Sequence, residues 1–231
     1  MTLQTENYDK WHAEHFYEND CNTLWYQFIL KNLSFELDVN QKYILEIGCG
    51  RGGFANYLAG TSSDKTHIIA SDFSNFALDQ AKQKFSSARI EWRKEDIQNL
   101  SFQNDWFDTI ISCETIEHVL DPQKAIRELY RVLKPGGRLF LTCPNYFNLF
   151  GLWCIYRWII GKPFTEGGQP YVNYILMPFI FLGLRKTGFR VQQYYSSDIL
   201  LPLRRPKHYF FDKTPGWLTF FGFRSFYILK K

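Results

Sequence analysis

Three closely spaced glycines stand between a short apolar run and a helix-like pattern, and this arrangement can hold a ligand. Residues 43–54 read YILEIGCGRGGF. Gly48, Gly50 and Gly52 remove side chains where the backbone must turn sharply, so a ligand can lie against bare peptide. Open α/β sheets bind ligands at the carboxyl ends of their strands, where the first amides of a helix also point. The stretch therefore predicts a strand, a ligand-binding turn and the start of a helix.

Two acids follow neighbouring predicted strands and have the chemistry to bind a nucleoside. Asp72 ends the strand after the glycine turn, and its carboxylate, which only accepts hydrogen bonds, can bind two vicinal hydroxyls at once. Asp96 stands just past the next strand, where a carboxylate and the following amide can contact the edge of adenine. Gly48, Gly50, Gly53 and Asp72 also fit the dinucleotide pattern G-x-G-x-x-G with its ribose acid, so two cofactors remain open.

The elements that position these residues alternate between strands and helices. Short apolar strands are predicted at residues 43–47, 67–71, 90–93, 106–112 and 138–142. Between them Ser74 can cap one helix, and Asp121 with Pro122 can begin another, which the turn at 134–137 ends. This alternation predicts an α/β fold with a doubly wound, mostly parallel sheet. At 231 residues and 45% hydrophobic composition, the chain is long enough for one well-buried domain.

The composition indicates which partners and which cellular compartment to expect. The five cysteines are odd in number and include no C-x-x-C pair with metal-ligand spacing, which predicts free thiols in a reducing cytoplasm and no metal site. The first residues, MTLQTENYDKWHAEHF, lack a basic region followed by an apolar core, so no signal peptide is expected. A formal net charge of +4 is mild for this length, and no nucleic-acid partner is expected.

Five segments in fixed order carry a family resemblance. EIGCGRGGF, SDFS, EDI, FDTIIS and LKPGGRLFLT together resemble the class I S-adenosylmethionine-dependent methyltransferases over residues 43–144. ETIEHVLDP and RVLKPGG make the chain similar to the small-molecule branch that includes the ubiquinone and menaquinone pathway enzymes. The resemblance implies a methyltransferase of EC class 2.1.1, S-adenosylmethionine as cofactor and a Rossmann-like, seven-stranded sheet. It adds a sixth strand near residues 189–195 and a final antiparallel strand near residues 223–229.

The resemblance also implies which residues hold the methyl donor. The methionine end would lie against Glu46, the backbone of Gly48, Cys49 and Gly50, and the pair Cys113 and Glu114. The ribose hydroxyls would bind Asp72, and adenine would contact Phe73, Asp96 and Ile97. Glu46 stands directly before the glycine turn, and an LKPGG turn precedes the fifth predicted strand. Both features favour this donor over a nicotinamide cofactor. No later Lys/His or Tyr/Lys constellation of the kind that hydride transfer uses is apparent in the sequence.

His118 is the first candidate for a catalytic base. It follows the fourth predicted strand at the ligand-binding edge of the sheet, and a base assists methyl transfer to a phenol or hydroxyl. Some relatives in the small-molecule branch have a histidine at or next to this position. An equally weighted alternative is that Glu117 and His118 begin a helix and fix the loop.

An aromatic-rich insertion, residues 146–187, follows the fifth predicted strand. Its first apolar run is shorter than the ~20 residues of a membrane-spanning helix. Five of its residues recur at about helical spacing: Leu149, Leu152, Trp153, Tyr156 and Ile160. The insertion is interpreted as a lid over the substrate, as an interfacial helix, or as a homodimer interface. As an interfacial helix it would place Trp153 and Trp158 at the lipid headgroups, with basic residues facing anionic lipid: Arg157, Lys162, Arg204 and Arg205.

The expected organisation is a single methyltransferase domain over residues 1–231. Helices fill residues 1–40, the cofactor core 41–145, the lid or insertion 146–187 and the C-terminal strands 188–231. The expected acceptor is a hydrophobic small molecule, a quinol, phenol or lipid-like compound methylated on oxygen. Alternatives are C- or N-methylation of a sugar or natural product, and a non-catalytic cofactor-binding partner of a membrane-associated biosynthetic complex. The expected location is cytoplasmic, with peripheral contact to the inner face of a membrane.

Overall fold

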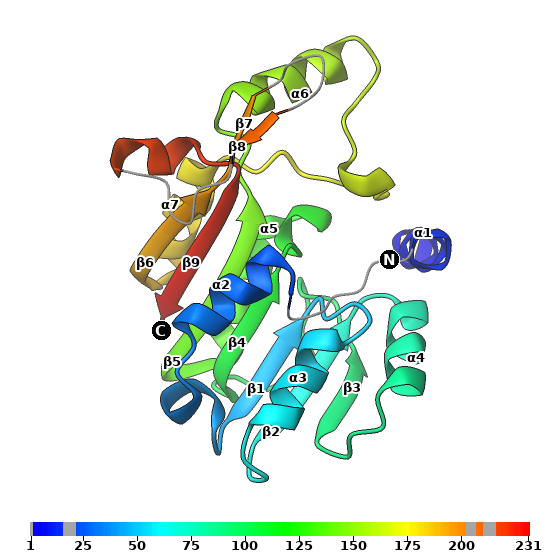
Figure 1. The fold of residues 1–231 in the computed structure, drawn as a ribbon, viewed down its shortest axis with the longest axis vertical. Helices are drawn as coiled ribbons and strands as arrows, with labels where there is room; N and C mark the ends of the chain where they lie inside the picture. The colour runs from blue at the N-terminus through cyan, green and yellow to red at the C-terminus, as the bar shows by residue number, and fades with distance from the viewer. Residues whose placement is uncertain (1, 16–21, 202–206, 210–215) are drawn as a thin grey trace.

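A seven-stranded sheet runs through the centre of the molecule in the order β3-β2-β1-β4-β5-β9-β6 (Figure 1). The computed structural model describes residues 2–15, 22–201, 207–209 and 216–231. The strands of the sheet are β1 (Tyr43–Ile47), β2 (His67–Asp72), β3 (Ile90–Lys94), β4 (Phe107–Cys113), β5 (Leu133–Pro144), β6 (Arg190–Ser197) and β9 (Arg224–Lys230). Strand β9 is antiparallel to β5 and β6, and the pairs among β1 to β5 are parallel. The predicted α/β sheet, with its sixth strand and its antiparallel last strand, is confirmed.

The fifth strand is longer than the sequence predicted. β5 begins directly after the preceding helix, so the LKPGG turn lies within the range assigned to the strand. Gly136 has a positive φ of 81° and the pairing with β4 shifts register between Phe107 and Thr109. The turn therefore bends the chain while pairing continues on both sides of it. A separate two-stranded sheet joins β7 (Ile199–Leu201) and β8 (Lys207–Tyr209).

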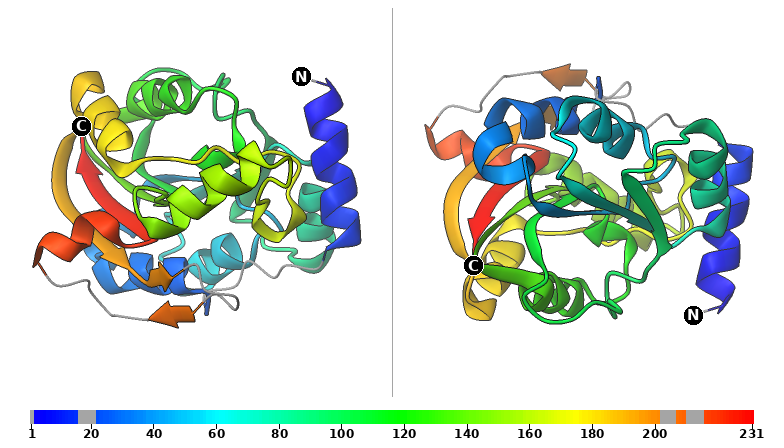
Figure 2. Two further views of the ribbon diagram at one scale, coloured as in Figure 1. Left: turned by 90° about the horizontal axis from the view of Figure 1, so that it is seen from above. Right: turned by 90° about the horizontal axis from the view of Figure 1, so that it is seen from below.

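Helices cover both faces of the seven-stranded sheet (Figures 1 and 2). The α-helices are α1 (Thr2–Glu14), α2 (Leu24–Asn32), α3 (Gly53–Thr61), α4 (Asn75–Lys84), α5 (Pro122–Val132), α6 (Leu149–Ile159) and α7 (Met177–Thr187). Shorter turns are the π-helix η1 (Phe35–Val39) and the 3-10 helices η2 (Ile116–His118), η3 (Glu166–Gly168) and η4 (Gly216–Phe221). Ser74 and Asp121 accept from the backbone N–H three residues later, so both predicted N-caps are formed.

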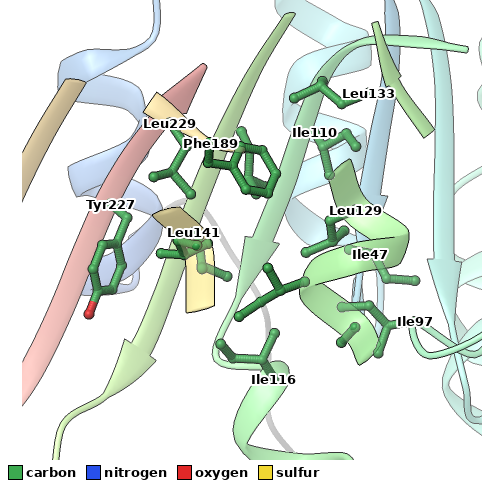
Figure 3. Packing of buried hydrophobic residues seen from close by; sticks show 14 of the residues in the cluster. Ile47, Ile97, Ile110, Ile116, Leu129, Leu133, Leu141, Phe189, Tyr227 and Leu229 are labelled. Atoms are coloured by element: carbon green, nitrogen blue, oxygen red, sulfur yellow. The ribbon is translucent and has the colours of Figure 1, made fainter. Parts of the chain in front are cut away.

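Two apolar clusters attach these helices to the sheet. One packs α5 and α7 against one face, and Figure 3 shows Leu129 of α5 and Phe189 beside the strand residues Ile110 and Leu141. The other packs α2, α3 and α4 against the opposite face. Each fully buried aliphatic or aromatic side chain contributes roughly 1.5–3 kcal/mol, so this burial on both faces fixes the layers. The strands are thus held rigidly, and their carboxyl ends form a stable platform.

Helix α6 lies beyond the carboxyl ends of the parallel strands (Figures 1 and 2). Its N-cap Asn148 accepts from Gly151, where a Cβ would lie 1.7 Å from the carbonyl oxygen of Tyr146. The predicted helical spacing is confirmed, but the helix buries a different side, made by Phe150, Gly151 and Cys154. The outer side is apolar and exposed: Leu149, Leu152, Ile155, Tyr156, Trp158 and Ile159. Among the described residues, no helix is long and apolar enough to cross a membrane.

Candidate active site

The glycine turn after β1 has the backbone that only glycine adopts easily. Gly48, Gly50 and Gly52 have φ values of 77°, 53° and 75°, in the left-handed region. A Cβ on Gly48 would lie 2.1 Å from Thr115 Oγ1, and a Cβ on Gly52 would lie 2.2 Å from the ring of Trp92. The backbone N–H groups of Gly48 and Cys49 both donate to the carbonyl of Ser71. The turn is therefore packed closely against Thr115 and Trp92, and its glycines leave the backbone bare.

Asp72 at the end of β2 is fixed by two backbone donors. Its Oδ2 accepts from Gly50 N at 2.8 Å, and its Oδ1 accepts from Ser74 N at 2.9 Å. Each carboxylate oxygen can accept more than one hydrogen bond, so the group remains able to bind ligand hydroxyls. The side chain is 9% exposed and lines the cavity above the turn. The structure thus joins the glycine turn and the acid, which are separated in sequence, into one cradle.

A cavity of about 340 Å³ opens at this edge of the sheet. Of the residues that the resemblance implied, all but Glu46 and Cys49 line it: Gly48, Gly50, Asp72, Phe73, Asp96, Ile97, Cys113, Glu114 and His118. The sequence did not identify other lining residues: Tyr8, Trp11, His12, Trp25, Gln98, Thr115 and Arg224. A donor with adenine, ribose and a methionine chain fits the cavity in composition. The bare glycine turn and the fixed Asp72 carboxylate are the parts that suit it.

Glu46 and Cys49 lie behind the turn, away from the cavity. Burial raises the pKa of the Glu46 carboxyl to about 8, although the hydrogen bond from Tyr26 Oη to its Oε1, at 2.8 Å, opposes the shift. The backbone N–H of Ala55 approaches the carboxyl and also opposes the shift, although Oε2 accepts no hydrogen bond of normal geometry from the described residues. Burial likewise raises the pKa of the Cys49 thiol. Glu46 of β1 thus binds α2 through its hydrogen bond with Tyr26. The glycine turn lies between this carboxyl and the cavity.

The side of the cavity that the resemblance assigns to adenine is built from residues that follow β2 and β3. Asp96 Oδ1 accepts from the backbone N–H and the side-chain amide of Gln98, at 2.8 and 3.1 Å. Ile97 is buried beside it, and Phe73 lines the same cavity. These contacts leave an apolar slot with a carboxylate at its rim, which suits a purine with an exocyclic amine.

Helix α1 forms a wall of the cavity through Tyr8, Trp11 and His12. Its Asp9 accepts from the hydroxyl of Ser74 and from Phe76 N, close to Asp72 in the chain. Arg51 in the glycine turn donates to the carbonyls of His12 and His15 at 2.7 and 3.1 Å. Because a side chain here recognises backbone carbonyls, the pairing has no sequence pattern. The helical spacing of Tyr8 and Trp11 was the one feature of the sequence that could have indicated this helix.

His118 lies in η2, directly against the loop that follows α6. Its Nδ1 donates to the carbonyl of Tyr171 at 2.9 Å, so the neutral ring carries its lone pair on Nε2. Nε2 lies 3.6 Å from Glu117 Oε1. Burial lowers the pKa of His118 to about 4, which keeps the ring neutral at physiological pH. The structure therefore presents His118 as a neutral imidazole at the cavity wall.

The loop between α6 and α7 closes over this histidine. Tyr8 Oη donates to the same Tyr171 carbonyl at 3.1 Å, and Trp11 Nε1 donates to the carbonyl of Gly167 at 3.0 Å. Asn173 N donates to the carbonyl of Glu117 at 2.7 Å. Gly167 and Gln169 line the cavity, whereas α6 does not. The part of the insertion next to the site is thus this polar loop.

The side of the cavity nearest β9 is polar and strained. Glu114 has a φ of 47°, and its Oε1 accepts from Thr142 Oγ1 at 2.8 Å. Burial raises the pKa of the Glu114 carboxyl, and the charge of Arg224 opposes that shift. Arg224, the first residue of β9, forms an ion pair with Asp198 and lines the cavity together with Trp25.

Comparisons with known proteins show which family and which relatives the sequence matches. Residues 45–141 match the family model of a methyltransferase domain. A ubiquinone biosynthesis O-methyltransferase of Xanthomonas oryzae pv. oryzae is 33% identical over 166 residues, which cover 71% of this chain and 69% of the relative. The corresponding enzyme of Coxiella burnetii is 29% identical over 160 residues, 63% of this chain. The matched region spans 66% of that relative's length, just under two thirds.

Solved structures share the fold at low sequence identity. An S-adenosylmethionine-dependent methyltransferase from Mesorhizobium loti aligns with a TM-score of 0.67 at 14% identity, covering 91% of this chain and 99% of the other. One from Aquifex aeolicus aligns with a TM-score of 0.58 at 18% identity, covering 89% of each chain. At these identities the alignments establish the arrangement of the sheet and its helices.

Proposed function

We propose that this chain, which belongs to the class I S-adenosylmethionine-dependent methyltransferases, methylates an oxygen of a hydrophobic small molecule. Its enzyme class and its methyl donor follow from the family. The relatives are ubiquinone biosynthesis O-methyltransferases, which supports an oxygen acceptor. The observation that carries the proposal is the cavity itself, in which Trp25, Ile47 and Val119 provide an apolar wall within reach of the glycine turn.

When bound, S-adenosylmethionine supplies a methyl group that its sulfonium already activates. The residues of the chain then have to position the acceptor oxygen and take its proton, and positioning alone can supply about 7–11 kcal/mol. We assign the ribose to Asp72, the adenine edge to Asp96 and Ile97, and the proton to Nε2 of His118. Burial keeps this nitrogen unprotonated and able to accept the proton, and the same lowered pKa makes it a weak base. The closed loop at residues 167–173 would exclude water from the acceptor.

The direct test is product analysis. Purified enzyme, isotope-labelled S-adenosylmethionine and hydrophobic extracts or defined phenols are incubated, and the products are identified by mass spectrometry. Label on an oxygen of a phenol or quinol supports the proposal. Label only on carbon or nitrogen, as in a C- or N-methylated sugar or natural product, contradicts it.

Replacing His118 by alanine is expected to lower turnover about a hundredfold, because a positioned base typically contributes 10²–10⁴-fold. Affinity for S-adenosylhomocysteine should change less than twofold, since His118 is not assigned to the donor. His118→Asn retains an N–H that can donate to the Tyr171 carbonyl, and it should be as inactive as alanine if the proton acceptor is what matters.

The matched control is His67→Ala, at the exposed start of β2 on the opposite edge of the sheet, which should leave turnover unchanged. Unchanged turnover in His118→Ala with the true acceptor would remove His118 as the base. Full activity of His118→Asn with an inactive alanine variant would reassign the residue to anchoring the loop.

We also propose that the outer side of α6 rests on an anionic membrane. Trp158 is 66% exposed and Ile159 69% exposed. Two basic residues accompany this side, Arg157 within α6 and Lys162 just after it. This sign of charge complements anionic lipid, and Trp and aliphatic residues favour the headgroup boundary. The sequence analysis also assigned Arg204 and Arg205 to this surface, but both lie outside the described residues.

Trp158→Glu is expected to reduce binding to anionic liposomes at least tenfold, and high salt should reduce wild-type binding as well. Trp153, which the sequence also placed at the headgroups, instead packs against Phe150 and Phe164, and its replacement would disturb the fold. Trp106→Glu, before β4 on the opposite edge, serves as control. Absence of lipid binding at low salt contradicts the proposal, and a dimer that Trp158→Glu dissociates would assign the surface to a second copy.

A further inference from the structure

A second cavity, the α7 groove, lies outside the active site, between α7 and η4 at the side of the molecule formed by β6 and β9 (Figure 1). Its volume is about 670 Å³, and among the described residues it shares no lining residue with the active-site cavity. Aromatic and aliphatic side chains line the groove together with a single charged residue, Arg185. Methyl transfer does not use these residues.

Helix α7 exposes more apolar surface than its packing requires. The side that packs on the sheet and α5 is buried: Met177, Ile180, Gly183 and Leu184. On its outer side Phe179 is 65% exposed and Leu182 48% exposed. Helix α5 packs on the same face of the sheet, yet it exposes Lys124 and Arg127 and no large apolar side chain. Apolar side chains gathered in the open on α7 therefore indicate a binding surface.

The opposite wall of the groove is aromatic. Phe147 and Phe221 line it, both are exposed, and their rings stack with centroids 5.8 Å apart. Phe220 also lines the groove, and its ring stacks on Tyr194 at 6.3 Å. Tyr194 in turn meets the edge of Phe181 of α7 at 6.5 Å. Ring contacts thus connect the two walls.

One buried side chain fixes the segments that form the groove. Asn145, which follows β5, has no exposed surface. Its Nδ2 donates to the carbonyls of Phe220 and Gly222, at 3.0 and 2.9 Å. Its Oδ1 accepts from Phe147 N at 2.9 Å and from Met177 N at 3.0 Å. Both walls are therefore held to one amide, and a groove shaped in advance binds a ligand at a lower entropic cost.

A cation stands at one end of the groove. Arg185 lies about two helical turns after Pro178, so the two lining residues are about 10 Å apart along α7. The Arg185 side chain is exposed and forms no ion pair or hydrogen bond with the part of the chain that the structure describes. Its guanidinium can bind a phosphate through two parallel N–H groups. Lys186 is equally exposed in the same turn but does not line the groove, which makes it a matched control.

The place of the groove next to α6 indicates the source of an apolar ligand with an anionic head. Phe147 lines the groove, and the next residue, Asn148, is the N-cap of α6. The groove therefore lies beside the start of the helix whose outer side is proposed above to rest on an anionic membrane. Such a membrane offers acyl chains that end in phosphate groups.

We propose that the α7 groove binds one acyl chain of an anionic phospholipid, with the lipid phosphate on Arg185. The chain lies between Leu182 on one wall and Phe221 on the other. This site differs from the surface of α6, because it takes a single chain out of the bilayer and holds it between two walls. It is a binding site additional to the one for methyl transfer.

Calorimetry with short-chain lipids below their micelle concentration tests the site without a bilayer. Dioctanoyl phosphatidylglycerol should bind the wild type at least tenfold more tightly than dihexanoyl phosphatidylglycerol, since each of two further buried methylenes contributes about fourfold. It should also bind at least fivefold more tightly than dioctanoylglycerol, which has the same chains and no phosphate. These comparisons use the wild-type protein alone.

Variants at exposed positions then locate the lipid. Leu182→Asp should weaken binding of both dioctanoyl lipids at least tenfold, whereas Phe179→Asp, on the same helix but outside the groove, should bind as the wild type does. Arg185→Gln should lower the affinity for phosphatidylglycerol to that for dioctanoylglycerol, and Lys186→Gln should retain the preference. Trp158→Glu should leave the binding of single lipids unchanged, because α6 does not line the groove. Thermal unfolding checks that each variant is folded.

Several results overturn the assignment. No saturable binding, equal affinity for the two chain lengths, or equal effects of Leu182→Asp and Phe179→Asp would exclude the acyl-chain site. Equal effects of Arg185→Gln and Lys186→Gln would exclude the phosphate contact. Lipid binding that saturating S-adenosylhomocysteine abolishes would place the lipid in the active-site cavity instead. A dimer that Leu182→Asp dissociates, with no lipid bound by the wild type, would assign the groove to a second copy of the chain.

Discussion

Asp72→Asn is expected to weaken S-adenosylhomocysteine binding by about a hundredfold or more. Both carboxylate oxygens accept a backbone N–H, one from Gly50 and one from Ser74, and both face the cavity edge where the ribose is assigned. Asparagine keeps one acceptor oxygen and turns an NH₂ group toward the other backbone donor. A hydrogen bond to a charged group contributes about 1.5–3 kcal/mol, so losing the ribose contacts and the shape of the turn accounts for this factor.

Thermal unfolding and calorimetry of Asp72→Asn separate the two contributions. The variant should unfold at lower temperature without donor, because two N–H donors then face each other, and it should gain little stability when donor is added. Asp79→Asn changes an exposed acid on α4 and should behave as wild type in both measurements. Donor affinity within threefold of wild type in Asp72→Asn would show that the ribose lies elsewhere.

The strands and helices of the core were predictable because their signals are local. A buried strand followed by glycines with positive φ, as at Ile47 and Gly48, has few alternative folds, since a side chain at Gly48 would overlap Thr115. The apolar side of α5 was equally predictable, because Ala125, Ile126 and Leu129 pack against one continuous face of the sheet. The cofactor side of the site follows from these elements, since each proposed ligand residue lies at or just past the carboxyl end of a strand.

The acceptor side could not be read in the same way. Helix α6 is apolar all round, so spacing alone did not tell which stripe is buried, and the small pair Gly151 and Cys154 decided it through close approach to the chain at Tyr146. Arg224 and Asp198 come together only because β6 and β9 pair antiparallel at one edge. Arg51 reaches α1 through backbone carbonyls. Such contacts depend on the tertiary fold and leave no periodic pattern.

Glu46→Gln is expected to stabilise the enzyme increasingly as pH rises. The folded state raises the carboxyl pKa from 4.5 to about 8, mainly by burial, so the folded chain holds the proton more tightly than the unfolded chain. The contribution is complete below about pH 4.5 and is lost as pH rises through 8. Over this window the free energy of unfolding of the wild type should fall, relative to the variant, by roughly 1 kcal/mol per pH unit.

Urea unfolding of both proteins from pH 5 to 9 gives this difference directly. A fixed cost of placing the glutamine amide near Ala55 shifts the variant's curve without changing the difference in slope. Tyr26→Phe removes the hydrogen bond that holds the pKa of Glu46 down, so it should extend the sloping region above pH 8. Parallel curves for wild type and Glu46→Gln would show that the carboxyl ionises as easily in the folded state as in the unfolded one.

The same variant decides whether Glu46 serves the donor or only the fold. If the methionine amino group reaches this carboxyl through the turn, binding of S-adenosylhomocysteine at pH 7 has to ionise it, and the wild type releases a proton that Glu46→Gln does not. Calorimetry in two buffers of different ionisation enthalpy measures that proton. Because Glu46 lies outside the cavity lining and bonds to Tyr26, a release of zero would assign it to fixing α2 on β1. The glycines in front of it would then hold the methionine end by backbone alone.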